Sequence, residues 1–193
     1  MWYHRDRKEG DAVKYRFKAP MPLPYGRFKL HYGLYVMTYD GPPLPEESGF
    51  FFPPYRDSGY RQLQKLEAEA FLPMRQQLDR RPHYLGPSAS DYWFHCRNRS
   101  DIVLCTEGKT LIAAGYALRR DRMISGVVTH PDHRRKGAAK AVVCRCVNHL
   151  LADRPGPITL TVVTINDAAI KLYQSLGFRI TGKKTYYREL NAE

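Results

Sequence analysis

The sequence predicts an α+β domain in which helices flank a central β-sheet. Segments rich in aromatic and β-branched residues alternate with segments whose apolar residues recur every three or four positions. The 193 residues suffice for one well-buried domain, with about fifty left over as an arm or an insert. No run approaches the roughly 18 consecutive apolar residues of a membrane span. The first residues also lack the apolar core of a secretory signal.

The first part of the chain predicts an arm, a strand and a loop. Residues 1–27 are rich in Lys, Arg, Tyr and Pro and end in a proline-rich run, which is typical of an extended segment. We therefore predict a basic, proline-rich arm over 1–27 and the folded domain over 28–193. The aromatic and β-branched segment Phe28–Tyr39 predicts a strand. The segment 40–58 contains Gly-Pro-Pro and Phe-Pro-Pro and predicts a long loop.

A helix followed by several strands is expected next. Apolar residues recur at helical spacing over 59–81, and Pro73 predicts a kink or a break into two helices. A second loop is expected over 82–90. Three strand segments then follow, the first two joined as a hairpin: 102–105, 110–118 and 123–129.

The pattern changes to a helical period at Ala139 and then returns to strands. From this residue the apolar positions form a clear helical stripe, which Pro155 to Pro157 end: Ala139, Val142, Val143, Cys146, Val147, Leu150 and Leu151. A strand is expected over 158–164. Asn166 is expected to cap a short helix that Gly177 ends, and 178–190 is again rich in β-forming residues.

The most informative segment, 130–139, lies between a predicted strand and a predicted helix. The first turn of a helix has unpaired N–H groups and a partial positive charge, so it is suited to bind a phosphate. The small side chains of 137–139 would let phosphate oxygens approach the backbone. Three cations precede them: Arg134, Arg135 and Lys136. A solvated basic turn is the alternative interpretation.

Two segments together resemble the GNAT acetyltransferase superfamily. Arg134 to Ala139 is similar to its pyrophosphate loop, Arg/Gln-x-x-Gly-x-Gly/Ala, with Ala139 at a position where glycine is common. Asn166 to Phe178 is similar to the family segment Asn-x-x-Ala-x-x-x-Tyr-x-x-x-Gly-Phe. Both occur in the family order, and the resemblance covers roughly residues 102–190.

The resemblance implies an α/β three-layer arrangement with a mixed, splayed sheet that binds acetyl-CoA (coenzyme A). Strands 123–129 and 158–164 would part near their middles and leave a gap for the pantetheine arm. The backbone of one strand and the amides of the loop would hold the cofactor, and Tyr173 would be catalytic. The implied cofactor-binding residues are Val127, Val128, Thr129, Arg134, Arg135, Lys136, Gly137, Ala138, Ala139 and Asn166.

The implied activity is N-acetyl transfer from acetyl-CoA to a primary amine by direct attack in a ternary complex. An alkylammonium must first lose a proton. A backbone N–H beside strand 123–129 would bind the developing oxyanion, and the protonated phenol of Tyr173 would supply a proton to the leaving thiolate. A buried core tyrosine is the alternative role for this residue.

The sequence does not select a general base. The strand before the loop holds Ser125 and no acid, whereas Glu107 and Asp121 are expected in solvated turns. His130 and His133 flank the loop and have suitable pKa values, yet either is equally compatible with a surface position. The base therefore stays open.

The net charge bears on the partners of the protein. It is +12, from 31 Lys and Arg against 19 Asp and Glu spread along the chain, and it favours anionic ligands in general. Three acceptors stay open: a protein N-terminus or lysine, a small molecule, and an amine carried by nucleic acid. A non-catalytic binding module with the same fold is the alternative of another class. A homodimer is compatible with the sequence, and no membrane partner is expected.

The cysteines predict a reducing compartment, so we expect a cytoplasmic protein. All four, at positions 96, 105, 144 and 146, lie among apolar or helix-like residues. Cys144, Cys146 and His149 invite a zinc interpretation, but on a helix the two cysteines point about 200° apart. The three side chains therefore cannot converge on one ion, and we expect core cysteines and no metal.

Overall fold

The computed structural model describes residues 28–46, 49–80 and 82–189, so the predicted arm over 1–27 lies outside the described residues. The described chain folds into one sheet with four α-helices, joined by short 3-10 turns at Asp57–Gly59, Arg99–Asp101 and Pro131–His133. The strands are β1 (Phe28–Tyr39), β2 (Ile102–Glu107), β3 (Thr110–Leu118), β4 (Met123–Thr129), β5 (Ile158–Val163) and β6 (Arg179–Glu189). The helices are α1 (Tyr60–Gln77), α2 (Ala89–Arg97), α3 (Ala138–Asp153) and α4 (Asp167–Ser175).

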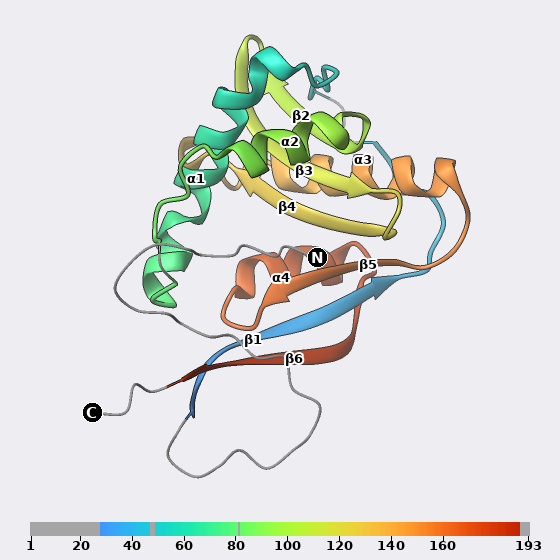
Figure 1. Cartoon of the computed structure of the whole chain (residues 1–193). Coiled ribbons are helices and arrows are strands. Elements are labelled where there is room, and N and C mark those ends of the chain that lie inside the picture. The colour runs from blue at the N-terminus through green and yellow to red at the C-terminus, as the bar shows by residue number, and fades with distance from the viewer. Residues whose placement is uncertain (1–27, 47–48, 81, 190–193) are drawn as a thin grey trace.

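The sheet is mixed, as the resemblance to the GNAT superfamily implies. Its six strands lie in the order β2-β3-β4-β5-β1-β6. Every neighbouring pair is antiparallel except β4 and β5, which are parallel. The strand that comes first in the chain, β1, therefore lies between the two that come last, and Figure 1 shows these three strands as one half of the molecule.

The two halves of the sheet meet at only one end of β4 and β5. Parallel pairing joins Met123 to Thr159 and Ile124 to Leu160, and no further pair follows along these strands. The prediction that the two strands part near their middles is thus confirmed. The parting leaves the backbone of β4 from Ser125 onward without β5 as its neighbour.

Helices cover both faces of the sheet around two hydrophobic cores. One core packs α3 and α4 against β3, β4, β5 and the end of β1. It contains the predicted stripe of α3, including Val142, Cys146 and Val147, all fully buried. The second core packs α1, with Phe94 of α2, against the other face of β2, β3 and β4. Figure 1 shows α1 and α2 on the near side of these strands and α3 behind them.

Two elements differ from the sequence predictions. The helix α1 continues through Pro73 rather than breaking there, and it ends at Gln77. Pro73 lies exposed on a helix whose other face is held in the second core, so tertiary packing compensates for the missing backbone donor. The helix α2 was not predicted, because its nine residues carry no repeated apolar stripe and bury only His95. Its start is fixed by Ser88, whose hydroxyl accepts a hydrogen bond from the Asp91 amide at 3.1 Å.

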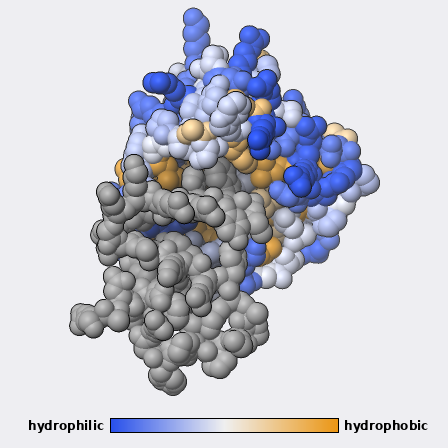
Figure 2. Space-filling model, in the orientation of Figure 1, coloured by the Kyte–Doolittle hydropathy of each residue, from blue (hydrophilic) through white to orange (hydrophobic). Residues whose placement is uncertain are grey.

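The surface is mixed in character. Hydrophilic residues predominate on the upper part of the face in Figure 2, and apolar side chains are visible around the middle of the molecule. Among the described residues, no helix combines the length and the apolar character needed to cross a membrane.

A β-bulge shapes β4 where it leaves β5. Ala114 pairs with Val128 and Tyr116 pairs with Ser125, so two residues of β4 stand opposite the single Gly115. The first of them, Gly126, has a left-handed backbone with φ of 57°. A Cβ at this position would lie 2.6 Å from ring carbons of Tyr116. Glycine is therefore required here by both backbone conformation and space.

We expect Gly126→Ala to destabilise the fold more than Gly108→Ala. The two glycines have nearly equal φ, 57° and 59°, but an added Cβ at Gly108 would meet nothing within 4 Å. Left-handed backbone alone costs alanine about 1–2 kcal/mol. The clash with Tyr116 should add about 1–3 kcal/mol at Gly126 only. Urea unfolding measures both variants, and equal losses would contradict the proposed contact.

Candidate active site

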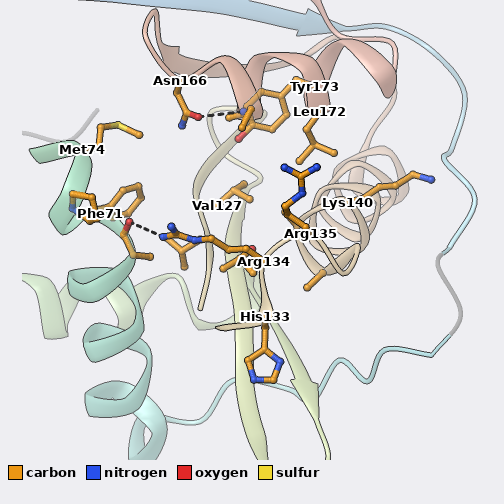
Figure 3. A pocket seen from close by; sticks show the side chains of 18 of the residues that line it. Phe71, Met74, Val127, His133, Arg134, Arg135, Lys140, Asn166, Leu172 and Tyr173 are labelled. Carbon is orange, nitrogen blue, oxygen red and sulfur yellow. Dashed lines mark hydrogen bonds between the residues drawn. The ribbon is translucent and has the colours of Figure 1, made fainter. Parts of the chain in front are cut away.

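A cavity of about 670 Å³ lies where β4 has parted from β5. Its walls come from α1, β4, the start of α3 and α4. Figure 3 shows Phe71 and Met74 of α1 on one side, Leu172 and Tyr173 of α4 on another, and Val127 of β4 between them. The predicted site residues that line it are Val127, Val128, Thr129, Arg134, Arg135, Gly137, Ala138, Ala139, Asn166 and Tyr173. Lys136 is exposed and does not line it.

The loop that ends this cavity has the backbone of an anion site. Arg135 and Gly137 adopt left-handed φ values of 63° and 89°, and α3 begins at Ala138 directly after them. Alternation of right- and left-handed residues turns successive N–H groups toward one point and forms a concave nest for anions. The Ala141 amide makes the first turn's bond, to the Gly137 carbonyl at 3.0 Å. The amides before it lie at the positive end of the helix dipole.

The space around this loop also suits a phosphate. A Cβ placed on Gly137 would meet only the ring of Phe50, at 3.7 Å, so no backbone segment of the described chain covers the glycine. Within that part of the chain, no carboxylate forms an ion pair with Arg134, Arg135 or Lys136. The Arg134 guanidinium instead reaches α1 and donates a hydrogen bond to the Ala70 carbonyl at 3.5 Å. The loop therefore fits the diphosphate of coenzyme A in both shape and charge.

The helix α4 supplies the opposite wall. Asn166 begins it as predicted: its side-chain oxygen accepts a hydrogen bond from the Ala169 amide at 3.2 Å. Tyr173 lies on the inner face of the same helix, buried beside Phe178 with ring centroids 5.9 Å apart. Burial, reinforced by the nearby Cys146 thiol, raises the pKa of Tyr173 above its usual range. The phenol therefore stays protonated and can donate a proton.

Sequence reasoning missed one ionisable group of this region, Glu67. It lies on α1 one turn before Ala70 and Phe71, which line the cavity. Its Oε1 atom would be 3.7 Å from a Cβ on Gly126, the residue that precedes Val127 on β4. Its side chain is only 12% exposed. A sequence signal did exist, because position 67 belongs to the same helical stripe as Leu63, Ala70 and Met74.

Burial dominates the electrostatics of Glu67. Desolvation raises the pKa of Glu67 to about 8; the hydrogen bond from Tyr116 opposes this shift and the Asp91 carboxylate adds to it. The Tyr116 hydroxyl lies 2.5 Å from Glu67 Oε1 and 2.7 Å from His95 Nε2. Glu67 therefore titrates close to neutral pH, as a catalytic base or acid requires.

The other candidate bases take up different positions. Glu107 is exposed at the end of β2 and lies 3.3 Å from His133, which lines the cavity near the loop. His130 pairs with Asp132 at 3.8 Å, and Asp121 is exposed in the turn before β4. Cys144 and Cys146 are buried in the core, as expected.

Comparison with known proteins identifies relatives. The model of the acetyltransferase (GNAT) family matches residues 54–178. No curated protein matches the sequence. Among solved structures, a GCN5-related N-acetyltransferase from Sphaerobacter thermophilus has a TM-score of 0.65 at 18% identity and covers 86% of this chain and 54% of its own. A GNAT-family protein from Novosphingobium aromaticivorans has a TM-score of 0.63 at 21% identity, covering 96% and 77%.

One further similar structure was solved with a bound cofactor. A Salmonella typhimurium protein solved with its cofactor acetyl-CoA has a TM-score of 0.56 at 13% identity and covers 76% of this chain and 95% of its own. These likenesses establish the fold. The chain spans little more than half of the Sphaerobacter protein, 54% of its length.

We expect Glu67→Gln to stabilise the protein at pH 8 and to leave it nearly unchanged at pH 5. The pKa of Glu67 is about 8 in the folded state against 4.5 ordinarily, so the folded protein binds the proton more tightly. The contribution of Glu67 to the free energy of unfolding is then highest below pH 4.5 and falls by roughly 1.4 kcal/mol per pH unit as pH rises toward 8. Glutamine removes this penalty and retains an oxygen that accepts from Tyr116.

Urea unfolding of wild type and Glu67→Gln at the two pH values measures the difference. Glu69→Gln is the matched control, because Glu69 lies on the same helix and pairs at 3.8 Å with the exposed Lys65. A pH-independent difference between wild type and Glu67→Gln would contradict the raised pKa.

Proposed function

Because the chain belongs to the acetyltransferase (GNAT) family, which uses acetyl-CoA, we propose that it transfers the acetyl group to a primary amine by direct attack in a ternary complex. One observation carries the proposal: a loop with a backbone suited to a phosphate opens onto a cavity at the place where β4 has parted from β5. The folded unit proposed for this activity is 28–193, and its cofactor-binding half is about 102–190. The absence of disulfides among its four cysteines supports a reducing compartment such as the cytoplasm.

Binding of the cofactor is assigned to the backbone and to the basic loop. The amides of 135–139 would hold the diphosphate, and Arg134, Arg135 and Lys136 would add positive charge. The exposed edge of β4 at Val127, Val128 and Thr129 would pair with the pantetheine arm, which has amides of its own. Asn166 would act by fixing the start of α4 and hence the opposite wall.

The chemistry needs hydrogen-bond donors to the thioester carbonyl, a proton donor to the sulfur and an entry for the amine. The bound cofactor supplies an acetyl thioester, an acyl donor that an uncharged amine can attack. Backbone N–H groups at the β4 bulge would donate to the carbonyl oxygen as its negative charge develops. Tyr173, kept protonated by burial, would give a proton to the sulfur. The amine would enter opposite the phosphate loop, where α1 faces β4.

We expect Gly137→Glu to abolish coenzyme A binding while the protein stays folded. The new carboxylate would occupy the nest and repel the diphosphate. Gly156→Glu is the matched control, because Gly156 also has a left-handed φ, of 126°, and follows the other end of α3. Calorimetric titration with coenzyme A measures both variants, and unaltered affinity in Gly137→Glu would refute the loop assignment.

We expect Tyr173→Phe to lower kcat by about 10²-fold or more with unchanged coenzyme A affinity, because the ring packing is kept and only the proton donor is lost. The assay follows thiol release with a panel of small amines, a lysine peptide and an aminoacyl-tRNA. Wild-type turnover with none of them, together with retention of nucleic acid, would favour a binding module instead. Wild-type rates in Tyr173→Phe would assign the tyrosine a packing role only.

A further inference from the structure

The carboxylate of Glu67 lies beside the β4 bulge, next to the stretch of β4 that lines the cavity. It approaches Gly126 at the β4 bulge, next to Val127, which lines the cavity. Thr129, nearest the phosphate loop, is three residues further along β4, or roughly 10 Å at the rise of a strand. Glu67 does not itself line the cavity; it lies behind the part of the wall formed by Ala70, Phe71 and Val127, farther from the phosphate loop than Thr129. The described residues of β4 itself offer no acid there.

Glu67 is the first member of a hydrogen-bonded chain that runs through three elements. It contacts Tyr116 of β3, whose hydroxyl also contacts Nε2 of His95 on α2. His95 Nδ1 lies 2.7 Å from the Asp91 backbone carbonyl, and His95 is fully buried. The Asp91 carboxylate accepts a hydrogen bond from the Tyr60 hydroxyl at 2.9 Å. Within the part of the chain that the structure describes, the ionisable groups near Glu67 include Tyr116, His95, Asp91 and Tyr60, and His95 Nε2 itself lies 4.0 Å from Glu67 Oε2.

The hydrogen-bond directions in this chain follow from one fixed acceptor. A backbone carbonyl can only accept, so His95 Nδ1 carries a hydrogen. The single hydrogen of the Tyr116 hydroxyl can then point to Glu67 or to His95. If it points to Glu67, that carboxylate is ionised, and a hydrogen on His95 Nε2, which makes the ring a cation, donates to Tyr116. If it points to His95, Glu67 is protonated and donates to Tyr116.

Both arrangements hold the same number of protons. Moving two hydrogens along the chain converts one into the other without displacing a heavy atom. The chain therefore provides an internal position for a proton, and Glu67 is its end nearest the cavity. Glu69, two residues later, instead pairs with the exposed Lys65.

We propose that Glu67 is the general base that removes a proton from the acceptor ammonium, and that Tyr116 and His95 are positioning residues that set its protonation. This inference rests on the proposed function. One N–H bond of the ammonium breaks and an O–H bond forms on Glu67. The freed nitrogen lone pair then bonds to the acetyl carbon as the carbon–sulfur bond breaks. The second nitrogen proton reaches the sulfur through Tyr173, and the proton on Glu67 leaves to solvent.

The decisive experiment compares acceptors that need a base with acceptors that do not. Benzylamine is an ammonium at pH 7, whereas methoxyamine is already neutral. In Glu67→Gln, kcat/KM for benzylamine should fall by about 10²- to 10⁴-fold, and that for methoxyamine by roughly tenfold or less. Glu69→Gln should behave as wild type with both. Equal losses with the two amines in Glu67→Gln, at unchanged coenzyme A affinity, would overturn the assignment.

The dependence of kcat/KM on pH in Tyr116→Phe tests the positioning role of Tyr116. In wild type, kcat/KM for benzylamine should rise with pH and level off near the Glu67 pKa of about 8. The hydrogen bond from Tyr116 lowers the pKa of Glu67, so its removal should move this limb to higher pH. A purely structural role for Tyr116 would lower the rate and leave the limb in place.

A measurement without turnover separates this inference from the proposed function. Carbon-13 NMR of glutamate-labelled protein, free of any ligand, follows the one carboxyl signal that is lost in Glu67→Gln. A midpoint near pH 8 supports the inference even if none of the amines is acetylated, in which case the proposed function alone fails. A midpoint near the ordinary 4.5 overturns the inference whatever the activity.

Discussion

β4 stays paired with β5 only at Met123 and Ile124, and two residues later it bulges away from β3 at Gly126. At Gly126 and Val127 the strand therefore lacks β5 on one side and a regular β3 partner on the other. Backbone N–H and C=O groups in such a position need other partners. The cavity, the approach of Glu67 and the access of a ligand to the β4 backbone all depend on this short interrupted stretch.

The site combines two ways of attracting charge. At the proposed phosphate loop, fixed backbone dipoles and three side-chain cations would attract an anion. At the bulge, a single carboxyl is held among buried rings so that its pKa rises. The proposed anion site depends on fixed dipoles and cations, whereas the carboxyl at the bulge changes its charge with pH. Along β4, three residues separate Gly126 from Thr129.

Local sequence patterns predicted the elements around the proposed cofactor site well. The stripe of α3, the small residues after Lys136 and the cap at Asn166 are each determined by residues within a few positions of one another. The acceptor side was harder, because its groups meet only in the tertiary structure. Glu67 lies on α1, Tyr116 on β3 and His95 on α2, the helix that the sequence analysis did not predict. The spacing of these residues along the sequence does not link them. The continuity of α1 through Pro73 likewise depends on packing against the second core.

The place of β1 has a consequence for the order of folding. It pairs Leu34 with both Val163 and Lys184, contacts between residues far apart in the chain. Such non-local pairs raise the contact order, which slows folding because long loops must close first. During synthesis, β1 emerges before its partners β5 and β6 and cannot pair until they are made. In contrast, β2, β3 and β4 can pair with one another through local hairpins. The half of the sheet that supplies β5 is thus the later one to form, and the gap between the halves is a boundary between early and late structure.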